Sequence, residues 1–265
     1  MKKLILSLAA TAALIGFSTT AEAAKLKVCF LYVGSKTDGG YTQGHDIGRQ
    51  MVDKELGDKV TTQYLENVAE GADAERAIER FARSGCKLVF TTSFGFMDAT
   101  VKVAAKFPKV KFEHATGYKT GKNLTTYNAR FYEGRYIQGQ IAAKISKNHT
   151  AVYIASFPIP EVVQGIDSFA IGARSVDPSF KLKVIWVNSW FDPGKEADAA
   201  KAAIDQGVDV ITQHTDSTGP MQVAAVHVAG IGHQSVLHLP QGELTTPNFE
   251  RIYSVENGKL GLKAD

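Results

Sequence analysis

The strongest constraint on the fold is a regular alternation of short apolar runs with segments of helical length, which begins at Lys27. The first apolar run, residues 28–34, is followed by a Gly-rich polar turn and then by a segment with a helical period. Strands separated by helix-length connections form parallel sheets. The alternation runs to Ala115 and restarts at Thr150, so the sequence predicts an α/β protein with two doubly wound parallel-sheet lobes.

Chain length supports the division into two lobes, because 265 residues are many for one compact domain and sufficient for two. We expect an N-terminal α/β lobe over residues 24–130. Over residues 131–265 we expect a helix that crosses into a C-terminal α/β lobe. Beyond Pro220 the pattern weakens, because residues 221–228 fit a helix but the residues after them show no clear period.

Residues 1–23 have the composition of a cleaved secretory signal peptide. Two lysines precede a short apolar core at residues 4–17, and Ala21 and Ala23 are the small residues that a signal peptidase recognises. The core is shorter than the roughly 20 residues that cross a bilayer, and no Cys stands at the cleavage point to carry a lipid anchor. We therefore expect a free protein in the periplasm, cleaved near Ala23.

The charge of the chain gives no indication of a polyanionic partner. The formal net charge is +3, and removal of the signal peptide with its two Lys and one Glu leaves +2. This balance is too weak to favour binding to nucleic acid or to an anionic membrane. We expect a monomer that binds no nucleic acid.

The chain has two cysteines, Cys29 and Cys86, each at or near the start of an apolar run. In an oxidising compartment two such residues can pair, and the first and third strands of a doubly wound lobe are neighbours. Two buried thiols are the alternative. The distance between the two Cα atoms decides between them, and we favour the disulfide.

Four turns at the expected strand ends carry the candidate binding residues. Three of them place large aromatic side chains beside acids, and the fourth, at residues 213–219, is entirely polar. Because ligands bind outside the carboxyl ends of the strands in such sheets, these turns predict a cleft lined by aromatic rings and carboxylates. The candidate ligand-binding residues are Asp38, Tyr41, Phe94, Asp98, Trp190, Phe191, His214 and Asp216.

A cleft of this kind suits a flat, hydrogen-bonding ligand such as a nucleobase. Each stacked ring adds about 0.5–1.5 kcal/mol, and a buried acid selects for hydrogen-bond donors because leaving it unpaired costs about 1–3 kcal/mol. Core packing explains Phe94 and Phe191 equally well. Helix capping likewise explains Asp98 and Asp216 as well as ligand contact does.

Sequence signals for an enzyme or a metal site are weak. The chain has seven His but no HExxH, CxxC or Gly-x-Ser-x-Gly pattern. His227, His233 and His238 are loosely spaced, and scattered surface histidines explain them better than zinc ligands do. We expect no catalytic residue, no cofactor and no metal.

Four ordered motifs, together with the signal sequence, resemble the basic membrane protein family, whose members are solute-binding proteins of ABC importers. Many of these take up purine nucleosides or purine bases. The resemblance runs from about Lys27 to about Gln222, and it implies a type I periplasmic-binding-protein fold, similar to ribose-binding protein, with two lobes joined by a hinge. The motifs are residues 28–34 with 38–41, 91–98, 130–139 and 213–217.

The resemblance also implies roles for particular residues. An aromatic side chain from each lobe, here Tyr41 and either Trp190 or Phe191, would hold a purine base or nucleoside between them. Asp98 and Asp216 would bind the polar edge of the base or the sugar. An ABC permease in the membrane would recognise the closed form.

Family members usually continue for several dozen residues beyond the end of this chain. The similarity fades near Ala225, and no acid stands at residues 231–235, where the family would supply a further ligand contact. The resemblance therefore implies a second lobe that is shortened at its C-terminal end.

Two alternative functions stay open. A sugar or another small polar ligand would also fit, because aromatic rings stack on pyranoses as well. A secreted nucleoside hydrolase would use Asp98 or Asp216 together with a histidine, but the sequence shows no paired base motif for it.

Overall fold

A computed structural model of the protein describes residues 24–227, 229–231, 253–256 and 259–262. The predicted signal peptide, His233 and His238 lie outside these residues. Among the described helices, none combines the length and the apolar character that crossing a bilayer requires.

The first lobe is built on a five-stranded parallel sheet with the strand order β2-β1-β3-β4-β5. Its strands are β1 (Leu26–Leu31), β2 (Val60–Leu65), β3 (Leu88–Thr91), β4 (Lys111–Ala115) and β5 (Leu124–Tyr127). Its helices are α1 (Tyr41–Leu56), α2 (Ala72–Arg83), the short 3₁₀ helix η1 (Phe94–Phe96) and α3 (Met97–Lys106).

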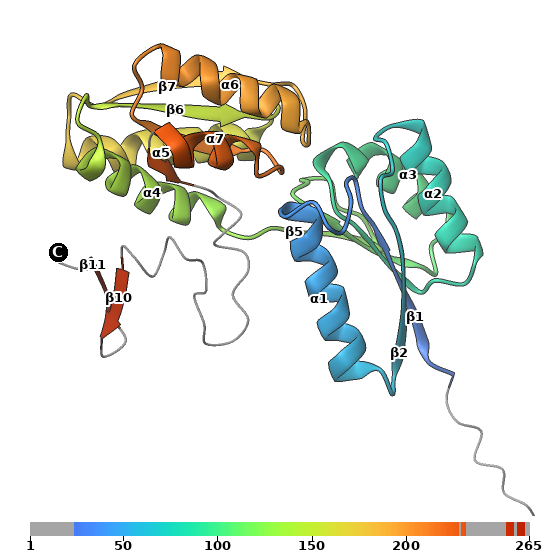
Figure 1. Ribbon diagram of the computed structural model, residues 1–265. Helices are drawn as coiled ribbons and strands as arrows, with labels where there is room; N and C mark the ends of the chain where they lie inside the picture. Colours follow the sequence, from blue (N-terminus) through green and yellow to red (C-terminus); the bar gives the residue numbers. More distant parts are fainter. Residues whose placement is uncertain (1–23, 228, 232–252, 257–258, 263–265) are drawn as a thin grey trace, which may run out of the picture.

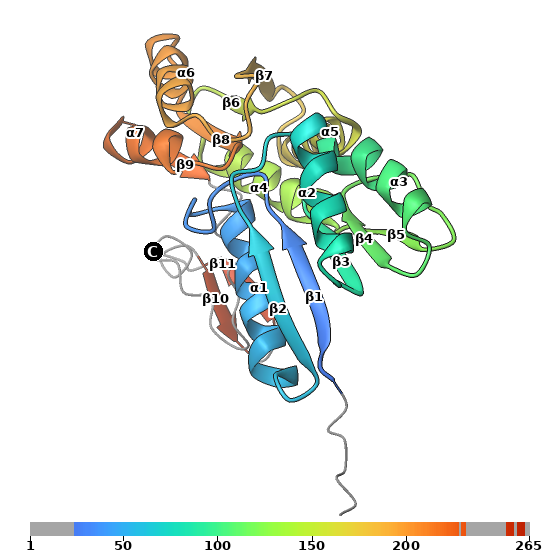
Figure 2. The same ribbon diagram turned by 90° about the vertical axis from the view of Figure 1, so that its right-hand side faces the viewer.

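Alternate residues of β1 explain why helices cover both faces of this sheet. Cys29 and Leu31 pack in one buried cluster with side chains of α2 and α3. Val28 and Phe30 pack in another cluster, against which Val52 of α1 lies. Since side chains of a strand point alternately to its two faces, a nearly continuous apolar strand such as β1 is buried on both sides. Figure 2 shows α1 beside strands β1 and β2 of this sheet.

A disulfide joins Cys29 of β1 to Cys86, which lies just before β3. The two Cα atoms are 6.0 Å apart, within the range that a disulfide spans. Strands β1 and β3 are paired neighbours, with Cys29 opposite Val89. The bond therefore closes a covalent loop within the first lobe.

The second lobe repeats this plan on a parallel sheet with the order β7-β6-β8-β9. Its strands are β6 (Thr150–Ala155), β7 (Lys181–Trp186), β8 (Val210–His214) and β9 (Ala229–Ile231). Its helices are α4 (Phe131–Ile145), α5 (Pro160–Val176), α6 (Pro193–Asp205) and α7 (Gly219–His227). Helices α4 and α5 cover one face of this sheet, and α6 and α7 cover the other. A separate antiparallel pair consists of β10 (Tyr253–Glu256) and β11 (Lys259–Leu262).

Helices α4 and α5 approach each other closely because glycines lie at their crossing. A Cβ atom on Gly139 would lie 2.0 Å from the carbonyl oxygen of Phe169, and one on Gly172 would lie 2.0 Å from that of Tyr136. No side chain fits at either position. This contact fixes the start of α5, which carries a residue of the site, relative to α4.

The chain passes from the first lobe to the second at residues 128–130, between β5 and α4. Figure 1 shows the two lobes side by side with this connection between them. The exposed Arg130 and Glu133 form an ion pair of 3.2 Å beside it. The structure confirms the predicted fold, two doubly wound parallel-sheet lobes joined by a hinge.

Candidate functional site

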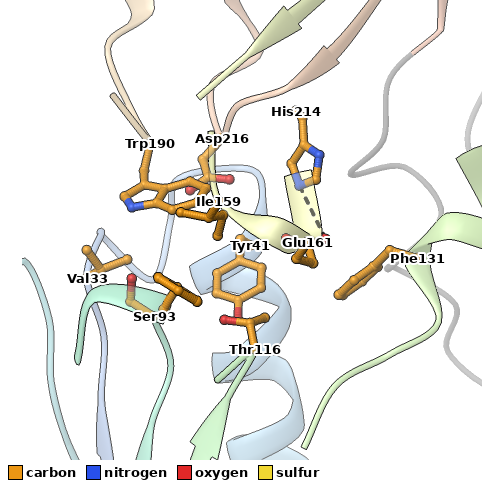
Figure 3. Close-up of a pocket in the computed structure, with 11 residues that line it drawn as sticks. Val33, Tyr41, Ser93, Thr116, Phe131, Ile159, Glu161, Trp190, His214 and Asp216 are labelled. Atoms are coloured by element: carbon orange, nitrogen blue, oxygen red, sulfur yellow. Dashed lines mark ion pairs between the residues drawn. The ribbon is translucent and has the colours of Figure 1, made fainter. Parts of the chain in front are cut away.

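The carboxyl ends of both sheets supply residues to one pocket between the lobes (Figure 3). The free volume among these side chains is about 30 Å³, far below the roughly 300–1,000 Å³ of ligand pockets in general. A molecule of nucleobase size does not fit between these side chains as they stand. The pocket is lined by Val33, Tyr41, Ser93, Phe94, Thr116, Phe131, Ile159, Glu161, Trp190, His214 and Asp216.

Tyr41 forms part of the first-lobe wall from the first position of α1. Its ring meets that of His45 edge-on, with the centroids 4.5 Å apart. Burial raises the pKa of the Tyr41 phenol well above its usual range. The phenol is therefore protonated at neutral pH and adds an uncharged ring to the pocket.

Asp38 holds the turn that places Tyr41. Its carboxylate accepts hydrogen bonds from the backbone N–H groups of Gly40 (2.7 Å), Thr42 (3.0 Å) and Gln43 (3.0 Å). A carboxylate in this position satisfies amides that the start of a helix leaves unpaired. Asp38 thus positions the aromatic wall and does not itself line the interlobe pocket.

Trp190 forms part of the opposite wall, in the loop after β7. Its carbonyl oxygen accepts a hydrogen bond of 2.8 Å from the backbone N–H of Asp216. Its ring lies against Phe157, with the centroids 5.1 Å apart and an angle of 60° between the planes. The second lobe therefore fixes both the backbone and one face of this residue.

Glu161 and His214 form a buried polar pair in the second lobe. Glu161 lies in the first turn of α5, and His214 is the last residue of β8. His214 Nε2 is 3.5 Å from Glu161 Oε1, and His214 Nδ1 is 3.1 Å from the Tyr153 hydroxyl. If the Tyr153 O–H donates to Nδ1, the neutral ring carries its proton on Nε2, directed at Glu161.

The charges of this pair are set by burial and by Arg135. Burial, followed by the positive charge of Arg135, lowers the pKa of His214 and keeps the ring neutral. Burial alone would raise the pKa of Glu161, but its hydrogen bond to His214 and the positive charge of Arg135 outweigh that effect, so the pKa is lowered. At neutral pH the pocket therefore contains an ionised Glu161, a hydrogen-bond acceptor.

Arg135 of α4 is fully buried behind this pair. Its Nη1 donates to the carbonyl oxygen of Gln213 at 2.8 Å, and its guanidinium carbon lies 5.2 Å from the centre of the Tyr153 ring. It supports the end of β8, from which His214 extends.

Asp216 differs from Glu161 in the direction in which its pKa is shifted. It is buried, and desolvation, followed by the negative charges of Asp38, Glu196 and Glu161, raises its pKa well above the usual value. A protonated carboxyl group can donate a hydrogen bond. The pocket thus combines an acid that accepts hydrogen bonds with an acid that favours its donor form.

Besides Asp38, two residues predicted from sequence to bind ligand, Asp98 and Phe191, lie outside this pocket. The Asp98 side chain, in the first turn of α3, is 72% exposed and pairs with Lys119 at 2.6 Å. Phe191 is 46% exposed and lines a neighbouring surface hollow that also includes Asp38. The structure brings Tyr41, Phe94, Trp190, His214 and Asp216 together in the pocket.

The sequence analysis missed Glu161, Arg135, Thr116 and Phe131. A signal for Glu161 was present, because it follows the turn after β6, at the same sheet edge as the predicted residues. No comparable signal marks Arg135, which contacts a strand 78 positions away along the chain. Within the part of the chain that the structure describes, no group of three His, Cys, Asp or Glu is arranged to hold a metal ion.

The fold and the pocket together define the class of two-lobed α/β proteins with a pocket between the lobes. A solved structure of an ABC transporter solute-binding protein from Aeropyrum pernix K1 shares this fold, with a TM-score of 0.68 and 21% identity. That match covers 78% of this chain and 61% of the other.

The chain belongs to the family of PnrA-like ABC transporter substrate-binding proteins, whose family model matches residues 25–241. A purine-binding protein of Brucella abortus is 65% identical over 224 residues, which are 83% of this chain and 64% of that protein. A protein of Haloferax volcanii, named as an ABC transporter glucose-binding protein, is 42% identical over 86% of this chain and 57% of its own length. The chain therefore spans less than two thirds of either relative. The family match confirms the resemblance drawn from the motifs.

Proposed function

We propose that this protein binds a purine base or nucleoside between its lobes and delivers it to an ABC permease, without catalysis. The observation that carries the proposal is the arrangement of Tyr41 and Trp190, which come from opposite lobes and line the same pocket as two acids, Glu161 and Asp216. The name of the Brucella abortus relative supports a purine. The predicted signal peptide supports a periplasmic location.

The chemistry of the pocket suits a purine. Tyr41 and Trp190 provide stacking surfaces, each worth about 0.5–1.5 kcal/mol beyond the area buried. A purine carries N–H donors beside ring-nitrogen acceptors along its edge. Ionised Glu161 accepts from the former, and protonated Asp216 donates to the latter.

Lobe separation and closure complete the proposal. Because the pocket has a free volume of only about 30 Å³ here, the ligand enters an open form, and the lobes then close around it about the connection at residues 128–130, at a wider separation than in this structure. Closure excludes water, which strengthens the hydrogen bonds of the buried acids. The permease then recognises the closed surface.

A sugar is the second candidate, because the Haloferax volcanii relative is named as a glucose-binding protein. Aromatic side chains also stack on pyranose rings. A pyranose, however, has hydroxyls around its whole rim, whereas this pocket draws both of its acids, Glu161 and Asp216, from the second lobe and sets apolar side chains such as Val33 and Ile159 beside the rings.

Calorimetric titration of residues 24–265 with purine bases, purine nucleosides, glucose and pentoses tests the proposal. Trp190→Ala should weaken purine binding about tenfold or more, and Glu161→Gln should weaken it by removing the charged acceptor. Trp186→Ala is the matched control, because Trp186 lies four positions away in β7 and does not line the pocket. Binding of glucose but no purine would contradict the proposal. Incubation with adenosine and inosine should give no hydrolysis products.

A further inference from the structure

Glu70 connects the two lobes beside the pocket. It lies in the first lobe, in the loop between β2 and α2. Its Oε1 atom accepts hydrogen bonds from the Ser93 hydroxyl (2.6 Å) and the backbone N–H of Gly95 (3.2 Å), both in its own lobe. The same oxygen accepts a third hydrogen bond, of 3.3 Å, from the indole Nε1–H of Trp190 in the other lobe.

We propose that Glu70 is a positioning residue that fixes the indole ring of Trp190 across the gap between the lobes when they close. This inference rests on the proposed function, in which Trp190 stacks on the ligand. In the closed form, Trp190 of the second lobe is then hydrogen-bonded directly to Glu70 of the first lobe.

The first lobe holds the acceptor oxygen in place independently of Trp190. Ser93 and Gly95 both donate to it from the turn that leads into η1 and α3. The carboxylate lies so close to the backbone there that a Cβ atom on Gly95 would be 2.1 Å from Glu70 Cδ. Glu70 therefore presents a fixed, charged acceptor, and closure requires no rearrangement of it.

The second lobe holds Trp190 through other atoms. Its carbonyl oxygen is bound by the Asp216 N–H, and its ring lies against Phe157. The indole N–H instead donates to Glu70 of the other lobe. When the lobes separate, this hydrogen bond breaks and the N–H donates to water. The hydrogen bond thus distinguishes the closed form from the open one.

The expected effect of removing Glu70 on purine affinity follows from the exposure of its side chain to solvent. Glu70 is exposed to solvent, so the hydrogen bond replaces a bond to water and its net contribution is modest. We expect Glu70→Ala to weaken purine binding roughly threefold to tenfold. Glu70→Gln should lose less, because its amide oxygen still accepts from the indole and from Ser93.

The experiment measures purine affinity by calorimetry and the Trp190 indole N–H resonance by ¹H–¹⁵N correlation spectra. The chain has two tryptophans, so Trp186→Phe assigns the two indole signals. Glu55→Ala is the matched control, since Glu55 is an exposed glutamate of α1 in the same lobe. Trp190→Phe keeps an aromatic ring without the N–H donor, and the double variant with Glu70→Ala completes a mutant cycle.

The inference predicts that Glu70→Ala shifts the Trp190 indole resonance, weakens purine binding, and has no further effect when Trp190 is already Phe. An unchanged resonance and an unchanged affinity in Glu70→Ala would overturn the inference. It would also be overturned if Glu70→Ala lowered the affinity of Trp190→Phe as much as that of the wild type, because the loss would then arise within the first lobe. If the wild-type protein binds no purine, the proposed function fails, and the resonance recorded with whichever titrated ligand does bind, such as glucose or a pentose, then decides the inference. A shift with Glu70→Ala and not with Glu55→Ala would support it, and no shift would refute it.

Discussion

The glycine at the crossing of α4 and α5 allows a sharp test of how packing positions the site. Replacement of Gly139 by Ala would put a Cβ atom 2.0 Å from the carbonyl oxygen of Phe169 and 2.8 Å from the backbone nitrogen of Ala173. Both are backbone atoms of α5, so neither can rotate away. Helix α5 must shift, and its first turn carries Glu161 of the pocket.

The structure gives the magnitude of the change. Real Cβ contacts are essentially never shorter than 3.0 Å, so the 2.0 Å approach requires the helices to separate by about 1 Å at this point. Overpacking of this kind costs about 1–3 kcal/mol of unfolding free energy, and more where backbone opposes backbone. We expect Gly139→Ala to lower the unfolding free energy by about 2 kcal/mol or more. Displacement of Glu161 should also weaken ligand binding.

Urea unfolding followed by circular dichroism measures the loss, and calorimetry measures the binding. Gly134→Ala is the matched control on the same helix, because a Cβ there meets nothing within 4 Å. Ala favours a helix over Gly by up to about 1 kcal/mol, so the control should be as stable as the wild type or more so. Equal stability of the two variants would refute the argument that the crossing of α4 and α5 depends on a bare backbone.

Three further outcomes follow from other parts of the structure. Reduction of the Cys29–Cys86 disulfide, whose partners are 57 positions apart, should lower the unfolding free energy by about 4 kcal/mol on the chain-entropy estimate, and an unchanged urea midpoint in reductant would contradict this. Burial lowers the pKa of His114 from its ordinary 6.5 to about 4, so the unfolded chain binds more protons between these values. Stability should therefore be full above pH 6.5 and fall by up to roughly 3 kcal/mol as the pH drops to 4, and His114→Gln should flatten this dependence in urea unfolding at pH 7 and pH 5. Asp98→Ala should leave ligand affinity unchanged in calorimetry, because the Asp98 carboxylate is exposed and paired with Lys119, and a tenfold loss would return it to the site.

Much of the fold could be predicted from the sequence because its strands are buried on both faces. The apolar run of β1 and its repetition at β6 mark central parallel strands directly. The rule that ligands bind at the carboxyl ends of strands then pointed to the edge at which the interlobe pocket lies, and Tyr41 and Trp190, both predicted from it, line that pocket.

The same rule could not say which way each side chain of a turn points. Asp38 and Asp98 both follow strands at the correct edge, but the carboxylate of Asp38 is bound by the amides of its own helix. Asp98 lies beyond the extra turn of η1 and faces solvent. Arg135 could not be found, because a fully buried arginine is rare and its contacts join residues far apart in the chain.

The narrow space between the lobes also has a kinetic consequence. If the lobes close on a bound molecule as proposed, the molecule cannot leave while they stay together, so its escape rate is the opening rate multiplied by the chance of leaving before the lobes reclose. Motions of this kind take microseconds to milliseconds, which caps release at roughly 10³–10⁶ events per second. A ligand contact that slows the opening of the lobes lengthens the residence time of the ligand. Two ligands of equal affinity but different opening rates therefore stay bound for different times.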